Sequence, residues 1–521
     1  MRKLGFLAIF LSVFVFAGCA SATTYYISFS SGSNANNGTS KSTPWKTHPY
    51  MQSAAGCTGT GSAPSYSHAA GDQFIFKQGD SWPNACFDMV IQNGGAPGNP
   101  DVYTFDPTWG TPGGTTGNLG QAVGTYQFTA GGSVINGSDG WNNFIYDNLP
   151  NSYIIFNGME LTGLTWTGCP SFGNAHMFQI FTTTDLTISN IYAHGWTHSN
   201  STCDSMNGIR GQASSPYNVR TRVTGSVFDG ANSGGSGVAD SGEAAAELQM
   251  MDNNIVKNMS NGLLPTANAI VHDNQIGPIN LSFDSSDHEN CIEPIVMPAG
   301  MTSTNYFYNN VWHDCTAVGI LTQGAAPSSG IEIDYLWNNV AYVGSVSGPP
   351  IPMQFDSVSS SNSSSEIHAW NNTIYGGTSD VCMRTIGRGN GNFGVIDIEN
   401  NHCISDVGTI TLGTNANTYK NTNNVLMGTS AAGSQGFTSS ETYAYSPTSG
   451  SSGTVGAGAN LTTFASGNTA SLVKDTIYGG VRTAKSRPSS GAWDAGAYEF
   501  SSSGASGAPA PPTNVKVLVV Q

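Results

Sequence analysis

The sequence predicts an all-β fold, a single-stranded right-handed parallel β-helix (a solenoid) with an internal asparagine ladder. The first observation is a short recurring motif in which one or two asparagines separate two apolar stretches, as in Tyr306–Trp312 (YFYNNVW). The second is its spacing. The final asparagine of each copy stands at Asn254, Asn274, Asn310, Asn339, Asn372, Asn401 and Asn424. A fixed motif at gaps of 20 to 36 residues is typical of a solenoid whose coils carry insertions.

The third observation is the chemistry of the motif. Asparagine tolerates the left-handed backbone conformation, and its side-chain amide both donates and accepts hydrogen bonds. At the same bend of every coil, stacked amides would bond to one another, and the flanking Val, Ile, Trp, Tyr and Phe favour strands. The alternative, surface turns of a β-sandwich, does not predict so many copies in the same apolar context.

Composition agrees with one long solenoid domain over residues 23–500. The chain has 521 residues, 65 of them glycine, and only 10% are charged, which suits tight coils with small or turn-forming side chains. The net charge of −16 argues against nucleic acid and anionic lipid as partners. A polyuronate partner would need bridging cations or a local basic strip.

The two ends are predicted to lie outside the solenoid. Arg2 and Lys3 precede an apolar run that is too short for a membrane span, so residues 1–22 are predicted to be a signal peptide. Cleavage after Ala22 gives a secreted protein, whereas a lipoprotein box at Phe16–Cys19 gives a cell-surface protein anchored by lipid at Cys19. Residues 501–521 are predicted to be a Pro/Gly/Ser-rich linker and tail.

The cysteines predict disulfides. Eight cysteines remain once Cys19 is set aside, and an even set in an exported protein is most simply paired. Pairing of neighbours in sequence gives four bonds, namely Cys57–Cys86, Cys169–Cys203, Cys291–Cys315 and Cys382–Cys403.

Several segments outside the motif carry a family resemblance. They are Tyr25–Ser28 (YYIS), Thr43–Thr47 (TPWKT), Gly71–Trp82 (GDQFIFKQGDSW), Gly94–Pro100 (GGAPGNP) and Asp494–Phe500 (DAGAYEF). Together they resemble the first coils and the closing strand of exported right-handed parallel β-helix proteins of the pectate-lyase-like superfamily. The resemblance spans nearly the whole mature chain. It implies the fold but not the reaction, because the superfamily includes lyases, hydrolases, epimerases and adhesins.

In that superfamily the catalytic groove lies on the strand that follows the long loops. If Ile209, Ile292, Ile320, Met353 and Met383 point inward, strand alternation sends the next residue of each strand outward. The predicted outward row is Arg210, Glu293, Leu321, Gln354 and Arg384.

An acidic stretch, Asp284–Glu293, supplies the candidate metal ligands. Oxygen-rich side chains on neighbouring loops are what a calcium ion prefers, so Asp284, Asp287 and Glu289 are predicted to hold Ca²⁺. A lyase needs a cation to neutralise the uronate carboxylate and a base to remove the C5 proton. Arg210, Arg384 and Glu293 are the predicted catalytic residues, and Gln354 and His288 the predicted substrate-binding residues.

The leading functional hypothesis is a monomeric polysaccharide lyase that acts on a uronate-containing glycan by β-elimination. The alternatives are a non-catalytic glycan-binding or adhesin-like protein and, third, a glycoside hydrolase that uses Asp287 or Glu289 with Glu293. The alternative for the acidic loop is a solvated surface, and the alternative for each arginine is an ion pair with a neighbouring acid. A lyase requires Arg210 or Arg384 to face the carboxylates of residues 287–293 across one groove.

Overall fold

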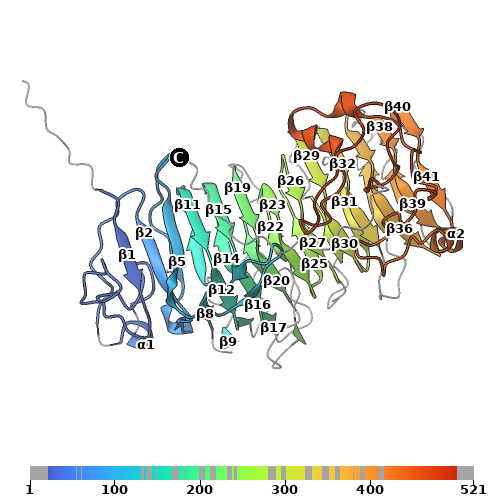
Figure 1. The fold of residues 1–521 in the computed structure, drawn as a ribbon. Helices are drawn as coiled ribbons and strands as arrows, with labels where there is room; N and C mark the ends of the chain where they lie inside the picture. Colours follow the sequence, from blue (N-terminus) through green and yellow to red (C-terminus); the bar gives the residue numbers. More distant parts are fainter. Residues whose placement is uncertain are drawn as a thin grey trace, which may run out of the picture.

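The computed structural model of the chain describes residues 21–500, except for residues 54, 60, 131–133, 136–142, 148, 167–174, 182, 199–205, 212–218, 231–237, 240–242, 280–288, 295–300, 323–330, 343–350, 358–363, 379–380, 388–392, 408–409 and 411–415. Its strands form three long sheets, here called A, B and C, whose strands follow one another along a single axis (Figure 1). From β2 to β37, each coil contributes one strand to A, then one to B, then one to C. The predicted right-handed parallel β-helix is confirmed.

Sheet A contains 13 strands, which are β1 (Thr24–Ile27), β2 (Gln73–Gln78), β5 (Asp101–Gly110), β11 (Ser152–Asn157), β15 (Thr184–Ser189), β19 (Thr221–Thr224), β23 (Met250–Asp252), β26 (Ile270–His272), β29 (Thr302–Tyr308), β32 (Ile331–Trp337), β35 (Glu366–Trp370), β38 (Phe393–Glu399) and β40 (Ala416–Thr422). Sheet B contains 12, which are β3 (Ser81–Trp82), β8 (Tyr126–Thr129), β12 (Met159–Thr162), β16 (Tyr192–His194), β20 (Val227–Asp229), β24 (Ile255–Lys257), β27 (Gln275–Ile276), β30 (Val311–His313), β33 (Val340–Tyr342), β36 (Thr373–Gly377), β39 (His402–Ser405) and β41 (Val425–Met427).

Sheet C contains ten, which are β4 (Met89–Val90), β10 (Ile145–Asp147), β14 (Ala175–Ile180), β18 (Met206–Arg210), β22 (Glu243–Ala246), β25 (Asn261–Leu264), β28 (Asn290–Ile292), β31 (Val318–Thr322), β34 (Ile351–Ser357) and β37 (Met383–Gly387). Shorter elements are β6 (Thr115–Thr116), β7 (Ala122–Val123), β9 (Val134–Ile135), β13 (Thr165–Trp166), β17 (Thr197–His198), β21 (Val238–Ala239), α1 (Ala55–Thr58), α2 (Thr429–Ser434), η1 (Asn84–Cys86), η3 (Thr462–Phe464) and η4 (Gly467–Val473).

The final asparagines of the motif form the predicted ladder at the corner between sheets A and B. From Asn254 to Asn424, each side-chain amide donates to the amide oxygen of the next asparagine at 2.9–3.2 Å. The same amide also donates to a strand carbonyl of the preceding coil, as Asn310 does to Val271 at 2.9 Å. Buried polar groups need partners, and the ladder supplies them at every coil by repeating one residue.

The first asparagine of each pair has a different role. Asn338, Asn371 and Asn400 have positive φ values of 53–59°, the left-handed conformation that turns the chain from sheet A to sheet B. Their side chains bond to the C-terminal segment (residues 428–500), since Asn338 donates to the carbonyl of Lys474 at 2.8 Å and Asn371 to that of Asp494 at 3.0 Å. Asn400 donates to the carbonyl of Ala459 at 2.8 Å.

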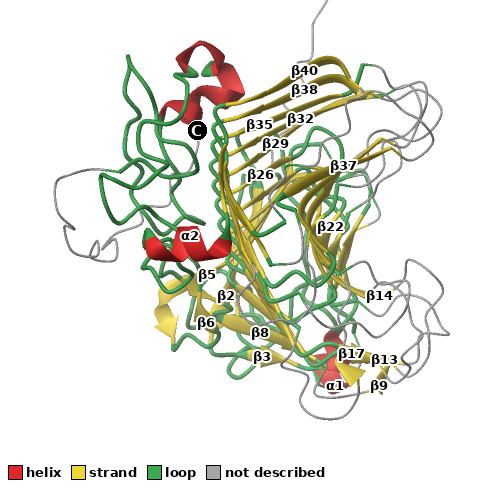
Figure 2. Ribbon diagram, turned by 90° about the vertical axis from the view of Figure 1, so that its right-hand side faces the viewer, coloured by secondary structure: helices red, strands yellow, loops and turns green. Residues whose placement is uncertain are grey.

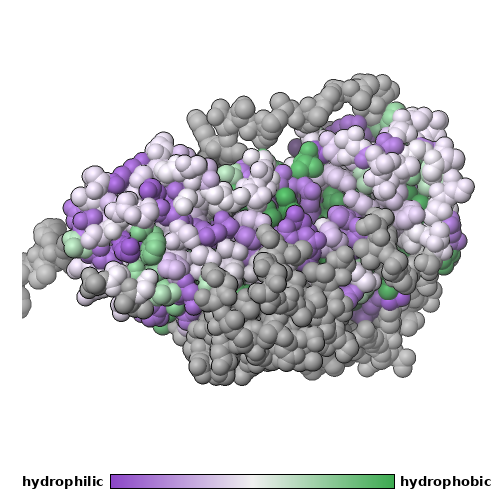
Figure 3. Space-filling view, turned by 90° about the horizontal axis from the view of Figure 1, so that it is seen from below, coloured by the Kyte–Doolittle hydropathy of each residue, from purple (hydrophilic) through white to green (hydrophobic). Residues whose placement is uncertain are grey.

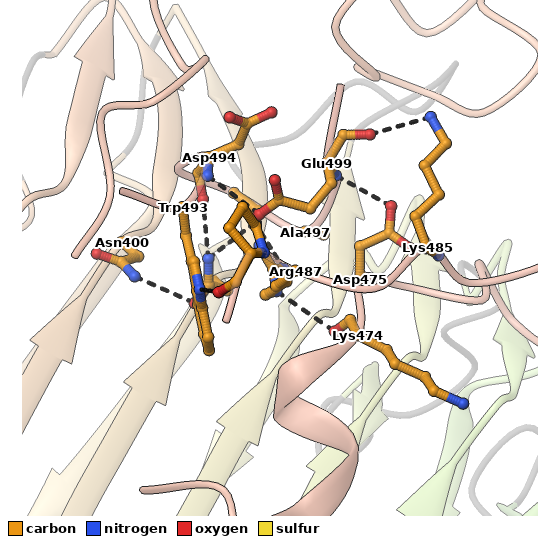
Figure 4. A network of polar contacts seen from close by, with 12 residues as sticks. Asn400, Lys474, Asp475, Lys485, Arg487, Trp493, Asp494, Ala497 and Glu499 are labelled. Carbon is orange, nitrogen blue, oxygen red and sulfur yellow. Dashed lines mark hydrogen bonds and ion pairs between the residues drawn. The ribbon is translucent and has the colours of Figure 1, made fainter. Parts of the chain in front are cut away.

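The C-terminal segment covers the corner between sheets A and B, on the side of the solenoid opposite to sheet C (Figure 2). Its centre is Arg487, whose side chain is fully buried (Figure 4). The guanidinium donates to Glu499 Oε1 at 2.6 Å and to Asn338 Oδ1 at 2.9 Å. The ladder corner and the C-terminal segment are therefore held together by buried charged and polar contacts.

Three of the four predicted disulfides are confirmed: Cys57–Cys86, Cys291–Cys315 and Cys382–Cys403. The fourth, Cys169–Cys203, lies outside the described residues, as do the predicted signal peptide up to residue 20 and the tail. No helix in the described part of the chain is long and apolar enough to cross a membrane. Seen from below, the described surface is mostly hydrophilic with a few small apolar spots (Figure 3).

Candidate functional site

The outer face of sheet C is the candidate site that the sequence predicted. Residues Ile209, Leu263, Ile292, Ile320, Met353 and Met383 stand in register on successive strands, with Ala245 between the first two, and all are fully buried. The next residue of each strand therefore lies on the outer face. This row reads Arg210, Ala246, Leu264, Glu293, Leu321, Gln354 and Arg384, which agrees with the predicted alternation.

The predicted catalytic residues share this row but do not touch. Glu293 follows β28, which lies three strands from β18 with Arg210 and three strands from β37 with Arg384. At a strand spacing of about 4.8 Å, each arginine backbone is roughly 14 Å from that of Glu293. The row is thus an extended face with a carboxylate between two cations, and it fits a chain-like ligand better than a compact one.

Arg210 is paired with an acid. Its Nη2 lies 2.6 Å from Oε1 of Glu247, which directly follows β22. The Arg210 side chain is 20% exposed and that of Glu247 is 7% exposed, so the ion pair is largely shielded from water. The Glu247 carboxylate stabilises the positive charge of Arg210, which is the opposite of what a catalytic base requires.

Arg384 has a different environment. Its Nε and Nη2 donate to the side-chain oxygen of Gln354 at 2.8 and 2.5 Å, and the Gln354 amide donates to Asp356 Oδ1 at 2.9 Å. Within the described part of the chain, no carboxylate contacts Arg384. A guanidinium has five N–H donors, and among the described residues two of those of Arg384 are used on a neutral partner, so the others can meet a ligand.

Glu293 and Glu289 flank β28. The amide of Asn290 donates to Glu293 Oε2 at 2.7 Å, and both side chains are buried. Glu289 precedes the strand with a φ of 50° and accepts a hydrogen bond at its backbone oxygen from Ala317. Asp284, Asp287 and His288 lie outside the described residues, and no group of three metal-binding side chains occurs among those described. The predicted calcium site therefore stays a prediction.

The sequence analysis missed an aromatic set on the outer face of sheet A. Tyr306, Tyr335 and His368 stand in register on β29, β32 and β35, and their rings stack along the solenoid. The sequence contains a signal for this set, because ring-bearing residues alternate with inward residues before the asparagine pairs at 309–310, 338–339 and 371–372, as in Tyr335–Trp337. Only the packing of the C-terminal segment against this face creates a cavity there.

The chain matches no protein-family model, and no curated protein is similar to it in sequence. Among solved structures it is similar to a GH136 lacto-N-biosidase from Eubacterium ramulus, with 10% identity and a TM-score of 0.37 over 78% of this chain and 68% of that one. A complex of XylC with xylose has 9% identity and a TM-score of 0.38, over 78% and 86% of the two chains. A rhamnogalacturonan lyase has 12% identity and a TM-score of 0.34, over 77% and 87%. At such identities these likenesses concern the fold and not the activity.

Proposed function

We propose that this is an extracellular or surface carbohydrate-active protein that binds a uronate-containing glycan along the outer face of sheet C and cleaves it by β-elimination. The observation that carries the proposal is Arg384, a guanidinium held in place by Gln354 with no carboxylate partner in the described part of the chain. In a protein with a net charge of −16, such a cation is one of the few groups that can attract an anionic sugar. Its planar fork of donors matches a sugar carboxylate.

The arginines and Glu293 have distinct roles in this proposal. Arg384 binds the uronate carboxylate and neutralises its charge, which acidifies the neighbouring C–H bond. Arg210, whose charge Glu247 already balances, binds and orients a neighbouring sugar unit. Glu293 lies between them, where a carboxylate can accept hydrogen bonds from sugar hydroxyls. In the elimination a base takes the C5 proton, the C4–C5 double bond forms as the C4–O bond breaks, and the leaving oxygen takes up a proton. Arg384 is not this base while its charged guanidinium holds the carboxylate.

Calcium is part of the proposal as a second source of positive charge. Asp284, Asp287 and Glu289 would supply its oxygen ligands, and they precede β28 in the sequence. A calcium ion at this place would bridge the acidic protein to an acidic glycan, which the net charge of the chain otherwise opposes. The contribution of calcium is measured by comparing activity with calcium and with chelator.

Export is supported by the three disulfides, since such bonds persist in oxidising compartments. The mature chain would therefore meet polysaccharide outside the cell. Whether it is released or anchored at Cys19 is decided by mass spectrometry of the mature N-terminus, because an anchored form starts with a lipid-modified cysteine.

The test is a screen of the purified mature protein on pectate, alginate and neutral plant glucans, with calcium and with chelator. We expect ultraviolet absorbance from unsaturated uronate ends that appears with calcium and is lost with chelator. New reducing ends without that absorbance would contradict β-elimination and favour a hydrolase that uses Glu293. Binding without any product would favour the non-catalytic glycan-binding alternative.

A further inference from the structure

A second feature of the molecule is a cavity between the outer face of sheet A and the C-terminal segment. Its volume is about 410 Å³, which lies within the usual range for small-ligand sites. Sheet A lines it with Tyr306, Tyr335, His368 and Trp370, and the C-terminal segment lines it with Thr463, Phe464, Ser466, Asn468 and Thr469. It stands on a different sheet from the row that contains Arg210 and Arg384.

The aromatic rings on the sheet side are stacked on one another. Tyr306 and Tyr335 lie 5.5 Å apart at 13°, and Tyr335 and His368 lie 4.6 Å apart at 8°. The faces of Tyr335 are therefore covered by its neighbours, which leaves ring edges and phenol hydroxyls for a ligand. Neither hydroxyl has a hydrogen-bond partner in the part of the chain that the structure describes.

The wall of the cavity opposite these rings contains both apolar and polar side chains. Phe464 stacks on Trp370 at 5.1 Å with one face, and 40% of its surface is exposed. Ser466 and Asn468 are exposed beside it and add a hydroxyl and an amide. An apolar face next to hydroxyl and amide groups is complementary to a sugar ring, which has apolar C–H faces and polar edges.

The charges near the cavity decide which kind of ligand fits. His368 Nε2 lies 3.0 Å from Glu366 and its Nδ1 lies 3.6 Å from Asp397, which also accepts a bond from Trp370 Nε1 at 3.1 Å. Burial lowers the pKa of His368, but the hydrogen bonds to Asp397 and Glu366 outweigh it and raise that pKa overall. Lys420, whose ammonium lies 5.8 Å from the centre of the Phe464 ring, pairs with Glu399. Even with His368 charged, the three carboxylates Glu366, Asp397 and Glu399 outnumber the two cations, which disfavours an anionic ligand.

We propose that this cavity binds a neutral sugar unit of a glycan and serves as an anchoring site separate from sheet C. A uronate or sulfated sugar is disfavoured by Glu366 and Asp397. A quaternary ammonium ligand is disfavoured because it needs open ring faces. Those of Tyr335 are covered by its neighbours, and the Phe464 ring already has the Lys420 ammonium near it. The phenol hydroxyls, the hydroxyl and amide of Ser466 and Asn468 and the exposed part of the Phe464 ring are the groups that recognise the sugar.

The test is calorimetric titration of the mature protein with a panel of neutral oligosaccharides of glucose, xylose, galactose and mannose. Oligogalacturonate and tetramethylammonium are the charged comparisons. We expect at least one neutral oligosaccharide to bind at millimolar concentration or better, and neither charged compound to compete with it. Failure of every neutral sugar to bind, or competition by a charged compound, would overturn the proposal.

Variants assign the binding to the cavity. Replacing Tyr306 and Tyr335 by phenylalanine removes only the two hydroxyls and keeps the stack, so we expect about fivefold to tenfold weaker binding from a folded protein. Phe464→Ala should weaken binding by about tenfold or more. The matched controls are Tyr419→Phe and Tyr419→Ala, at an aromatic residue of β40 that is 42% exposed and lies outside the cavity lining. Unchanged binding in the cavity variants would contradict the assignment.

This inference does not rest on the activity proposed for sheet C. Cavity variants should leave turnover of a short soluble uronate substrate unchanged, whereas Arg384→Gln should leave neutral-sugar binding unchanged. The two proposals can therefore fail independently.

Discussion

The asparagine corner and the outer face of sheet C belong to the same coils but follow opposite rules. At the corner, seven successive coils place asparagine at the same position, because each amide bonds to an identical amide in the neighbouring coil. Along sheet C the outward residue changes at every coil, from Arg210 to Glu293 to Arg384, while the inward residue stays apolar. In this solenoid, the positions that repeat the same residue in every coil stabilise the fold, whereas the outward positions that change from coil to coil form the surface that is available for function.

Breaking the corner should have the largest effect on stability. Asn339→Ala removes the donor to Asn372 and Phe307 and the acceptor for Asn310, all of them buried. Each unsatisfied buried group costs about 1–3 kcal/mol, so we expect a loss of roughly 3–5 kcal/mol in the free energy of unfolding. Urea unfolding followed by circular dichroism measures it. The control, Asn423→Gly, changes the exposed first asparagine of the last pair, keeps the positive φ and should cost at most about 1 kcal/mol.

Breaking the contact between the asparagine corner and the C-terminal segment should have the next largest effect on stability. Arg487→Met leaves Glu499 buried without its partner, and breaking a buried ion pair costs about 3–5 kcal/mol. We expect faster hydrogen exchange across residues 474–499, with the coils of sheet C unchanged. The double variant Arg487→Met/Glu499→Leu should recover most of the protection. Equal exchange in the single variant and the wild type would contradict the role given to this ion pair.

A smaller, pH-dependent effect is expected from two acids inside the coils. Asn305 donates to Asp334 Oδ1 at 2.9 Å and to Glu332 Oε1 at 3.1 Å, and both carboxyls are buried. Burial raises the pKa of Asp334 to about 7 and raises that of Glu332 as well. Between about pH 4 and 7 the folded protein retains a proton that the unfolded chain has released, so stability falls as the pH rises through that window.

Asp334→Asn removes this titration. We expect the variant to gain roughly 2 to 4 kcal/mol over the wild type between pH 4 and 8, because the pKa of Asp334 is raised to about 7 and one unit of pKa difference corresponds to about 1.4 kcal/mol. Unfolding midpoints at both pH values measure the gain. A difference between the two proteins that does not change with pH would show that Asp334 titrates normally.

Much of the fold could be predicted because its determinants are local in sequence. The asparagine motif repeats within each coil, and the three confirmed disulfides join cysteines 21–29 residues apart. The alternation around Ile292 and Met353 gave the outward row for the same reason. The motif alone could not separate the roles of Asn338 and Asn339, because Asn338 bonds to Lys474, 136 residues away.

The candidate site could be predicted only in outline. That Arg210 and Arg384 share a face follows from strand alternation. The partners of the two arginines, Glu247 for Arg210 and Gln354 for Arg384, depend on which residues of neighbouring coils come into register. Insertions of variable length between the strands decide that register, so the sequence alone does not predict it. The cavity at Tyr335 likewise depends on the docking of residues 463–469, far along the chain.

The most direct test of the account compares Arg384→Gln with the wild type by the absorbance of unsaturated uronate ends, alongside urea unfolding of both. Arg220→Gln is the matched control, because Arg220 is 60% exposed and pairs with Asp185 next to sheet A. The account predicts about a hundredfold loss of activity with an unchanged unfolding midpoint for Arg384→Gln, and no change for the control. Full activity in Arg384→Gln, or a loss explained by unfolding, would contradict the claim that the varied face of sheet C is the functional one.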